Sequence, residues 1–250
     1  METILYIYIF ILGLVLGSFY NVVGIRVADG ESIVKPRSHC PRCQRTLSAS
    51  ELIPVLSYLF QRGTCKGCGT KVSIKYPLFE GLTACLFLVA AVLVGWTSEL
   101  LIALLLISLL VIITISDLHK MLIPNKILLF FFIVFIPITV LIPHEPWWDG
   151  IVGFFVGGGL LYLIAIVSRG GMGGGDVKLF AVLGFILGTR DVLLTLFAAT
   201  FIGAVVGGIM MMTGKVKRKN PIPFGPFIAI GALVIYFFGE SLWHWYVQFL

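Results

Sequence analysis

The chain has 250 residues, of which 59% are hydrophobic, and its mean hydropathy is +1.05. This composition excludes a water-soluble globule and predicts a polytopic membrane protein. The formal net charge is +6, but the basic residues gather in short loops between apolar segments. They therefore indicate membrane orientation rather than binding to nucleic acid.

Eight apolar segments follow one another and predict an all-α fold with about eight transmembrane helices. In chain order they cover residues 4–25, 77–95, 99–116, 127–142, 150–168, 177–188, 192–212 and 222–239. The sixth is the shortest, and as a helix it extends only about 18 Å into a hydrocarbon core about 30 Å thick. A re-entrant sixth segment is therefore the alternative to a short crossing sheltered inside the bundle.

The positions of the basic residues favour eight crossings. With the N-terminus outside, all but one of the 18 lysine and arginine residues lie on the cytoplasmic side, and Arg190 is the exception. A re-entrant sixth segment would move the KVKRK cluster at residues 215–219 to the outside, against the same rule. Because no basic residue precedes the first apolar run, we expect a retained membrane anchor rather than a cleaved signal peptide.

The predicted organisation has three parts: a first transmembrane helix at 1–25, a cytoplasmic loop at 26–76, and a seven-helix membrane core at 77–250. Glycine-rich stretches at 157–159 and 203–208 lie inside apolar runs, where small residues allow neighbouring helices to approach closely. We interpret these stretches as packing surfaces.

Four cysteines in the cytoplasmic loop form the pattern C-x2-C-x21-C-x2-C, and they are Cys40, Cys43, Cys65 and Cys68. Four thiolates supply a closed tetrahedral shell for Zn²⁺, and a small loop with few apolar side chains needs such a constraint to hold its shape. Two disulfides would use the same residues, but the reducing side of the membrane favours zinc. His39 is interpreted as a neighbour of the site, and Cys85 as a packing residue.

Two aspartates occur at the edges of apolar segments, Asp117 in ITISDLHKMLIPN and Asp176 in SRGGMGGGDVKL. The predicted topology places both at the cytoplasmic rim, where they could form a carboxylate pair that shares one proton and performs acid and base catalysis. Glycines at 170–171 and 173–175 would allow an extended substrate to approach. The competing interpretation is that both aspartates cap helix N-termini.

Other charged residues are weaker candidates for chemistry. Lys178 could extend to the inner surface of the membrane, and Asp149 and Asp191 are predicted on the outer face. Two further functions remain open on residues alone. The aspartates could be proton or cation sites of a transporter, or the cysteine loop could belong to a non-enzymatic zinc-ribbon scaffold that recruits partner proteins.

Taken together, the motifs resemble the type IV prepilin peptidases, the GxGD aspartic proteases of the bacterial inner membrane. The resemblance runs along nearly the whole chain and rests on GSFYNVVGIR, PRSHCPRCQRTL, IPVLSYLFQRGTCKGCG, YPLFEGLTA, DLHKMLIPN, GMGGGDVKL and PFGPFIAIG. The short length is most similar to the competence-pilus members of Gram-positive bacteria. Asn125 and His119 depart from the acidic residues that many members carry beside the first aspartate.

The resemblance implies cleavage of the basic leader of prepilins or pseudopilins after a glycine, at the cytoplasmic face, with Asp117 and Asp176 as the catalytic pair. It also implies N-methylation of the new N-terminal residue with S-adenosylmethionine, and Glu80 is the acidic residue carried over for that activity. Expected partners are the substrate helices and membrane lipid. The sequence does not establish the oligomeric state.

Overall fold

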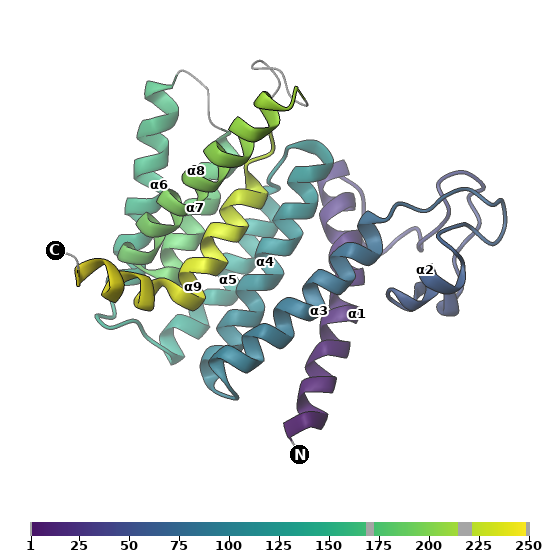
Figure 1. The fold of residues 1–250 in the computed structure, drawn as a ribbon, viewed down its shortest axis with the longest axis horizontal. Coiled ribbons are helices and arrows are strands. Elements are labelled where there is room, and N and C mark those ends of the chain that lie inside the picture. The colour runs from purple at the N-terminus through teal and green to yellow at the C-terminus, as the bar shows by residue number, and fades with distance from the viewer. Residues whose placement is uncertain (1, 169–172, 215–221, 249–250) are drawn as a thin grey trace. The chain divides into compact units, whose positions relative to one another are not determined.

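The computed structural model describes residues 2–168, 173–214 and 222–248, and it is all-α (Figure 1). No β-strand occurs in these ranges, although two isolated β-bridges lie in the loop after the first helix. The long helices are α1 (Glu2–Asp29), α3 (Lys75–Val94), α4 (Ser98–Lys120), α5 (Asn125–Leu141), α6 (Asp149–Val167), α7 (Gly174–Leu187), α8 (Thr189–Met212) and α9 (Gly225–Val247). The short helices η1 (Ala49–Leu52) and α2 (Leu56–Phe60) lie between α1 and α3.

Each of the eight predicted segments corresponds to one long helix, which confirms the prediction of an all-α polytopic membrane protein. In the described ranges, 6 helices are long and apolar enough to cross a membrane. α5 has 17 residues and α7 has 14. At about 1.5 Å per residue, α7 extends about 21 Å, which is shorter than a hydrocarbon core about 30 Å thick. That α7 crosses the membrane therefore stays a prediction. The KVKRK cluster lies outside the described residues.

Contacts divide the chain into two compact units, residues 1–115 and 116–250. In the first unit, α1 packs along α3 through glycines. A Cβ atom at Gly13 would lie 2.6 Å from the Cα of Ala84, and one at Gly17 would lie 2.9 Å from the Cα of Glu80. These glycines let two membrane helices approach to backbone contact, as small residues do in membrane interfaces.

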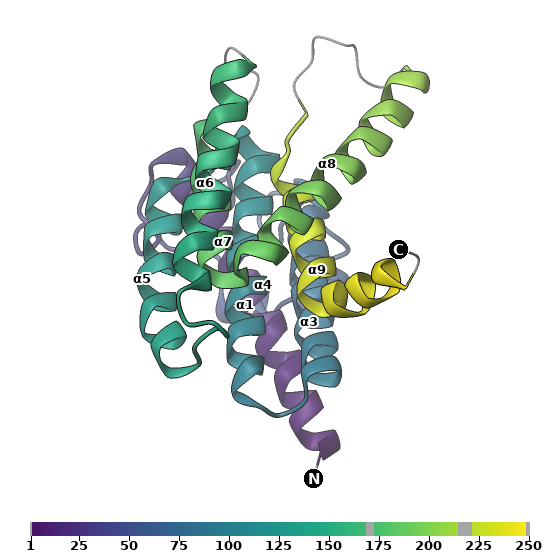
Figure 2. The ribbon, with the colours of Figure 1, turned by 90° about the vertical axis from the view of Figure 1, so that its left-hand side faces the viewer.

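In the second unit, α6 and α7 make a similar contact and lie side by side (Figure 2). A Cβ atom at Gly153 or Gly184 would overlap the backbone of the other helix, and one at Gly157 would lie 2.5 Å from the carbonyl oxygen of Phe180. The predicted packing role of the stretch at 157–159 is confirmed for Gly157, whereas Gly159 faces open space. This close contact fixes the position of α7, which carries Asp176.

Candidate active site and metal centre

Asp117 lies in the last turns of α4, and its side chain is buried with an exposed fraction of 6%. The helix ends three residues later, at Lys120, and the next residue, Met121, adopts a positive φ of 52° while its amide still donates to the carbonyl of Asp117. A carboxylate near a helix C-terminus is unfavourable for the helix dipole. Asp117 therefore does not cap the N-terminus of the helix that carries it, although its carboxylate does accept from the first amide of α9.

The Asp117 carboxylate faces the beginning of another helix. Its Oδ2 accepts a hydrogen bond from the backbone amide of Gly225 at 2.7 Å, and Gly225 is the first residue of α9. A Cβ atom at position 225 would lie 2.8 Å from Oδ2, so only glycine allows this approach. The role of Gly225 was not predicted, although the place of this glycine between Pro223 and Pro226 at a helix start is a usable signal in the sequence.

Asp176 lies in the first turn of α7 and is half-buried. The N-cap is Gly173, with no side-chain capping bond, and the Asp176 amide donates to the Gly173 carbonyl at 3.1 Å. The Asp176 carboxylate accepts a hydrogen bond from the backbone amide of Gly173, so Asp176 does contribute to capping α7, a role that is compatible with catalysis. A Cβ atom at Gly173 would lie 3.0 Å from Oδ2 of Asp176, so glycine at this position lets the backbone come close to the carboxylate. Gly170 and Gly171 lie outside the described residues.

Several contacts bring the two aspartates together within the second unit. Ile123, in the link between α4 and α5, packs against Gly175 at the start of α7. A Cβ atom added at Gly175 would lie 2.8 Å from the Cβ of Ile123. Nζ of Lys178 donates to Oδ1 of Asn125 at 3.0 Å, which joins the starts of α7 and α5. Asp117 and Asp176 are close enough for a direct electrostatic interaction between their carboxylates. Two such carboxylates can hold and exchange one proton between them.

The other two aspartates of this unit have structural contacts. Oδ2 of Asp149 accepts from the amide of Thr189 at 3.1 Å, and Asp191 pairs with Arg190 at 2.8 Å. Both contacts lie just after the end of α7, about 20 Å along the helix from Asp176. Their separation from the catalytic candidates agrees with the expectation that neither joins the pair.

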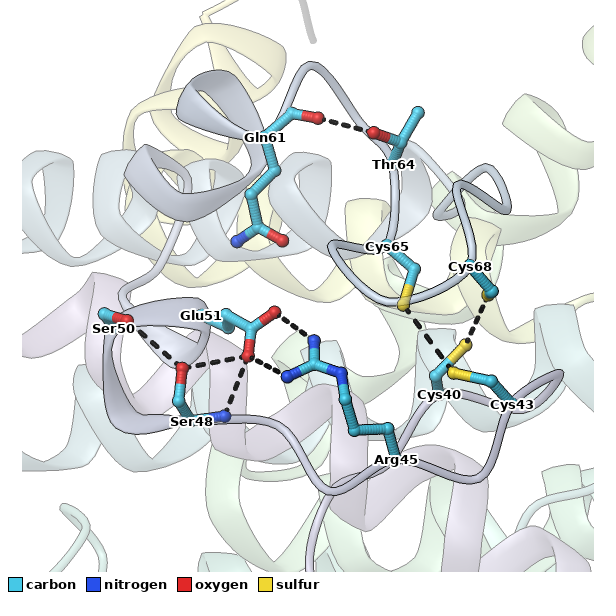
Figure 3. Close-up of polar contacts among 10 residues, drawn as sticks. All are labelled: Cys40, Cys43, Arg45, Ser48, Ser50, Glu51, Gln61, Thr64, Cys65 and Cys68. Carbon is cyan, nitrogen blue, oxygen red and sulfur yellow. Dashed lines mark hydrogen bonds and ion pairs between the residues drawn. The ribbon is translucent and has the colours of Figure 1, made fainter.

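The four loop cysteines form a compact group in the first unit (Figure 3). Their sulfur atoms all lie within 4.8 Å of one another, and two of the separations are 3.7 Å and 4.0 Å. Zinc–sulfur bonds of about 2.3 Å in a tetrahedron require sulfur separations of about 3.8 Å. A disulfide would require about 2 Å, and the cysteines are free. The residues present therefore fit a zinc ion.

Nearby donors favour the thiolate form at two of the four cysteines, whereas burial and the neighbouring thiols raise the pKa of Cys43 to about 11. The amides of Cys68 and Gly67 donate to the Cys65 sulfur and lower the pKa of its thiol to about 6. The hydroxyl and amide of Thr70 similarly lower the pKa of Cys68. Since thiolates rather than thiols bind zinc, these donors favour the metal-binding form near neutral pH.

Glu80 lies on α3 with an exposed fraction of 8% and receives hydrogen bonds from two other segments. The amide of Val55, at the start of α2, donates to Oε2 of Glu80 at 2.7 Å, and the Ser18 side chain is a further partner. Val55 has a positive φ of 59°, which is an outlier for a β-branched residue. A buried carboxylate thus holds a strained backbone at the junction of the loop with α1 and α3.

These features define a helical multi-pass membrane protein with a four-thiol metal-binding group and a separate pair of neighbouring aspartates. The chain belongs to the type IV leader peptidase family. The model of that family matches residues 104–208, and the model of the bacterial peptidase A24 N-terminal domain matches residues 11–94. This membership supports the peptidase interpretation of the sequence rather than the transporter or the scaffold.

Relatives with the same curated name, prepilin leader peptidase/N-methyltransferase, are similar to this chain over most of its length. One from Bacillus subtilis is 45% identical over 240 residues, which cover 96% of this chain and 97% of that protein. One from Aeromonas salmonicida is 34% identical, covering 96% of this chain and 93% of the relative. One from Neisseria gonorrhoeae is 32% identical, covering 93% of this chain and 90% of that relative. No solved structure matches this chain.

Proposed function

We propose that this chain is an aspartic endopeptidase that removes the basic leader of type IV prepilins or pseudopilins after a glycine and then N-methylates the new N-terminal residue. The observation that carries the peptidase proposal is the pair Asp117 and Asp176, which lie near enough for their charges to interact and fall in the region matched by the leader peptidase family. The names of the relatives support both activities.

In the proposed reaction, the ionised member of the pair removes a proton from a water molecule, and the water oxygen attacks the carbonyl carbon of the scissile bond. The protonated member donates its proton to the carbonyl oxygen, which yields a tetrahedral diol. When the C–N bond breaks, the leaving amine takes a proton from the first carboxylic acid. One diol hydroxyl returns its proton to the second carboxylate as the carbonyl forms again, which restores the starting pair. The amide of Gly225 fixes one oxygen of Asp117 during these transfers.

The proposed location is the bacterial inner membrane, with the N-terminus outside and both the cysteine loop and the active site on the cytoplasmic side. The distribution of lysine and arginine supports this orientation. A prepilin is itself a membrane helix with a basic leader on the inner side, so a catalytic pair at the inner rim would meet the scissile bond at the right depth. The substrates would include subunits of type IV or competence pili.

Purified protein in detergent, mixed with a prepilin from the same organism, tests the proposal by intact-mass measurement of the pilin. The expected product lacks the whole leader up to and including its last glycine. Failure of the folded enzyme to shorten any prepilin or pseudopilin encoded in that organism would overturn the proposed substrate class.

Gly225→Ala is expected to lower the rate of leader cleavage about 100-fold, because the new methyl group would displace the Asp117 carboxylate by a fraction of an ångström or more. The rate is measured by the pilin mass shift over time. Gly159→Ala is the matched control, since a Cβ atom there meets open space, and it should cleave like the wild type. Equal rates for both variants would contradict the role given to Gly225.

For the metal, we propose that Cys40, Cys43, Cys65 and Cys68 hold one Zn²⁺ ion as a structural centre. For methyl transfer, we propose that S-adenosylmethionine is the donor and that Glu80 serves this activity. When bound, S-adenosylmethionine supplies an electrophilic methyl group. Glu80 is a buried carboxylate that can hold a cationic group or accept the proton that the N-terminal amine loses.

Glu80→Gln is expected to leave leader cleavage within about threefold of wild type and to lower methylation at least 10-fold, because the neutral amide loses the charge and the basicity of the carboxylate. Intact mass separates the two activities, since the methylated pilin is heavier than the merely cleaved one by one methylene. A cleaved and fully methylated product from Glu80→Gln would remove Glu80 from the methyl-transfer reaction.

A further inference from the structure

An arginine–glutamate pair lies beside the four cysteines in the loop of the first unit (Figure 3). Glu51 lies in η1 with an exposed fraction of 7%. Its two carboxylate oxygens accept from the two terminal nitrogens of Arg45, at 3.0 Å and 2.5 Å. The amide and the hydroxyl of Ser48 also donate to Glu51, at 3.0 Å and 2.8 Å. These four bonds fix the plane of the guanidinium.

The same guanidinium faces the cysteine group. Arg45 follows Cys43 by two residues, and its guanidinium lies near enough to the Cys65 sulfur for their charges to interact. Its Nε atom is buried and has no hydrogen-bond partner among the described residues. The backbone of Gly67 is tight against Arg45, because a Cβ atom there would lie 3.0 Å from Nε. Arg45 therefore spans the space between Glu51 and the knuckle formed by residues 65–68.

The two cysteine knuckles, residues 40–43 and 65–68, have the same backbone hydrogen-bond pattern. They differ in the residue that follows each knuckle two positions after its second cysteine. In each knuckle the amide of the first cysteine bonds a carbonyl five residues later, from Arg45 in one and from Thr70 in the other. Thr70 lies 3.3 Å from the sulfur of Cys68. Equivalent positions thus carry a neutral hydroxyl in one knuckle and a cation in the other.

A zinc ion with four thiolates has a net charge of about −2, which favours nearby donors and cations. A cation that stays in place needs a partner of opposite charge, and Glu51 supplies one outside the sulfur shell. A surface ion pair of ordinary kind would contribute little and would have no reason to bury a donor next to sulfur.

We propose that Arg45, held in place by Glu51, is a positioning residue of the zinc centre that donates to the Cys65 thiolate and offsets the negative charge of the site. The inference rests on the proposed zinc centre. Arg45 would lower the tendency of Cys65 to leave the metal or to react, and Glu51 would act through Arg45.

The first test is the zinc affinity of the full-length protein in detergent, measured by competition with a chromophoric chelator. Arg45→Ala is expected to raise the dissociation constant for zinc about 10- to 100-fold. Lys66→Ala is the matched control, because it removes one positive charge from an exposed position between Cys65 and Cys68, and it should change the constant less than threefold. Arg45→Lys keeps the positive charge but lacks the planar guanidinium, so its dissociation constant for zinc should lie between those of Arg45→Ala and Lys66→Ala.

The second test separates an electrostatic role from a general loss of loop structure. In zinc-loaded Arg45→Ala, iodoacetamide is expected to alkylate Cys65 at least 5-fold faster than in wild type, with smaller changes at the other three cysteines, as mapped by peptide mass spectrometry. Equal acceleration at all four cysteines, or a zinc affinity equal to that of Lys66→Ala, would overturn the proposal. Should Arg45→Ala not fold, Glu51→Gln provides the same two readouts with smaller expected changes in the same direction.

The two proposals fail in different ways. A wild-type protein that binds no zinc would overturn the zinc centre itself. A wild-type protein that binds zinc as tightly as its folded Arg45→Ala variant would overturn only the role of Arg45.

Discussion

Asp117→Asn and Asp176→Asn are each expected to lower leader cleavage by about 1,000-fold or more while the protein stays folded and inserted. Asparagine has nearly the same shape as aspartate but can neither take a proton from water nor donate one as an acid. The rate is measured from the mass of the pilin over time, with equal amounts of each variant in the membrane.

Asp191→Asn is the matched control, because Asp191 pairs with Arg190 beyond the far end of α7. It should cleave within about twofold of the wild type, as surface ion pairs contribute little. Groups that act as one unit give non-additive losses of rate. The double variant of Asp117 and Asp176 should therefore cleave no more slowly than the less active of the two single variants. Undiminished cleavage by either single variant would contradict the assignment of the pair.

Cys40→Ser and Cys65→Ser are expected to lower the zinc content from about one ion per chain to below about 0.1, because three thiolates no longer close the tetrahedral shell. Without the metal, the loop between α1 and α3 should become sensitive to proteases. Acid should release zinc from the wild type as well, since protons compete with the metal for the thiolates.

Zinc content is measured by elemental mass spectrometry of purified protein, and loop sensitivity by limited proteolysis. Cys85→Ser is the control, because Cys85 is an exposed residue of α3 outside the group of four. A Cys65→Ser protein that retains a full zinc ion would show that the four cysteines are not its ligands.

The positions of the long helices could be predicted from the sequence, because the need to satisfy backbone groups in lipid leaves little choice for apolar segments. The ends of the helices could not. α1 continues to Asp29 and α9 to Val247, beyond the apolar segments that predicted them, since helical hydrogen bonds continue past the hydrocarbon boundary. The short helices η1 and α2 have no membrane signal and were missed.

The candidate site could be predicted in part. Charged residues at the edges of apolar segments identified Asp117 and Asp176, and cysteine spacing identified the four thiols. The roles of Gly225 and Arg45 depend on contacts between residues that are distant in sequence or belong to different turns of a loop. Such contacts leave no periodic pattern, so they required the structure.

The most direct test of the central claim is the intact mass of one prepilin produced in cells together with either the wild-type enzyme or Asp176→Asn. We predict a pilin without its leader in the first case and the full-length prepilin in the second. A pilin shortened equally in both would contradict the claim that this aspartate pair cleaves the leader.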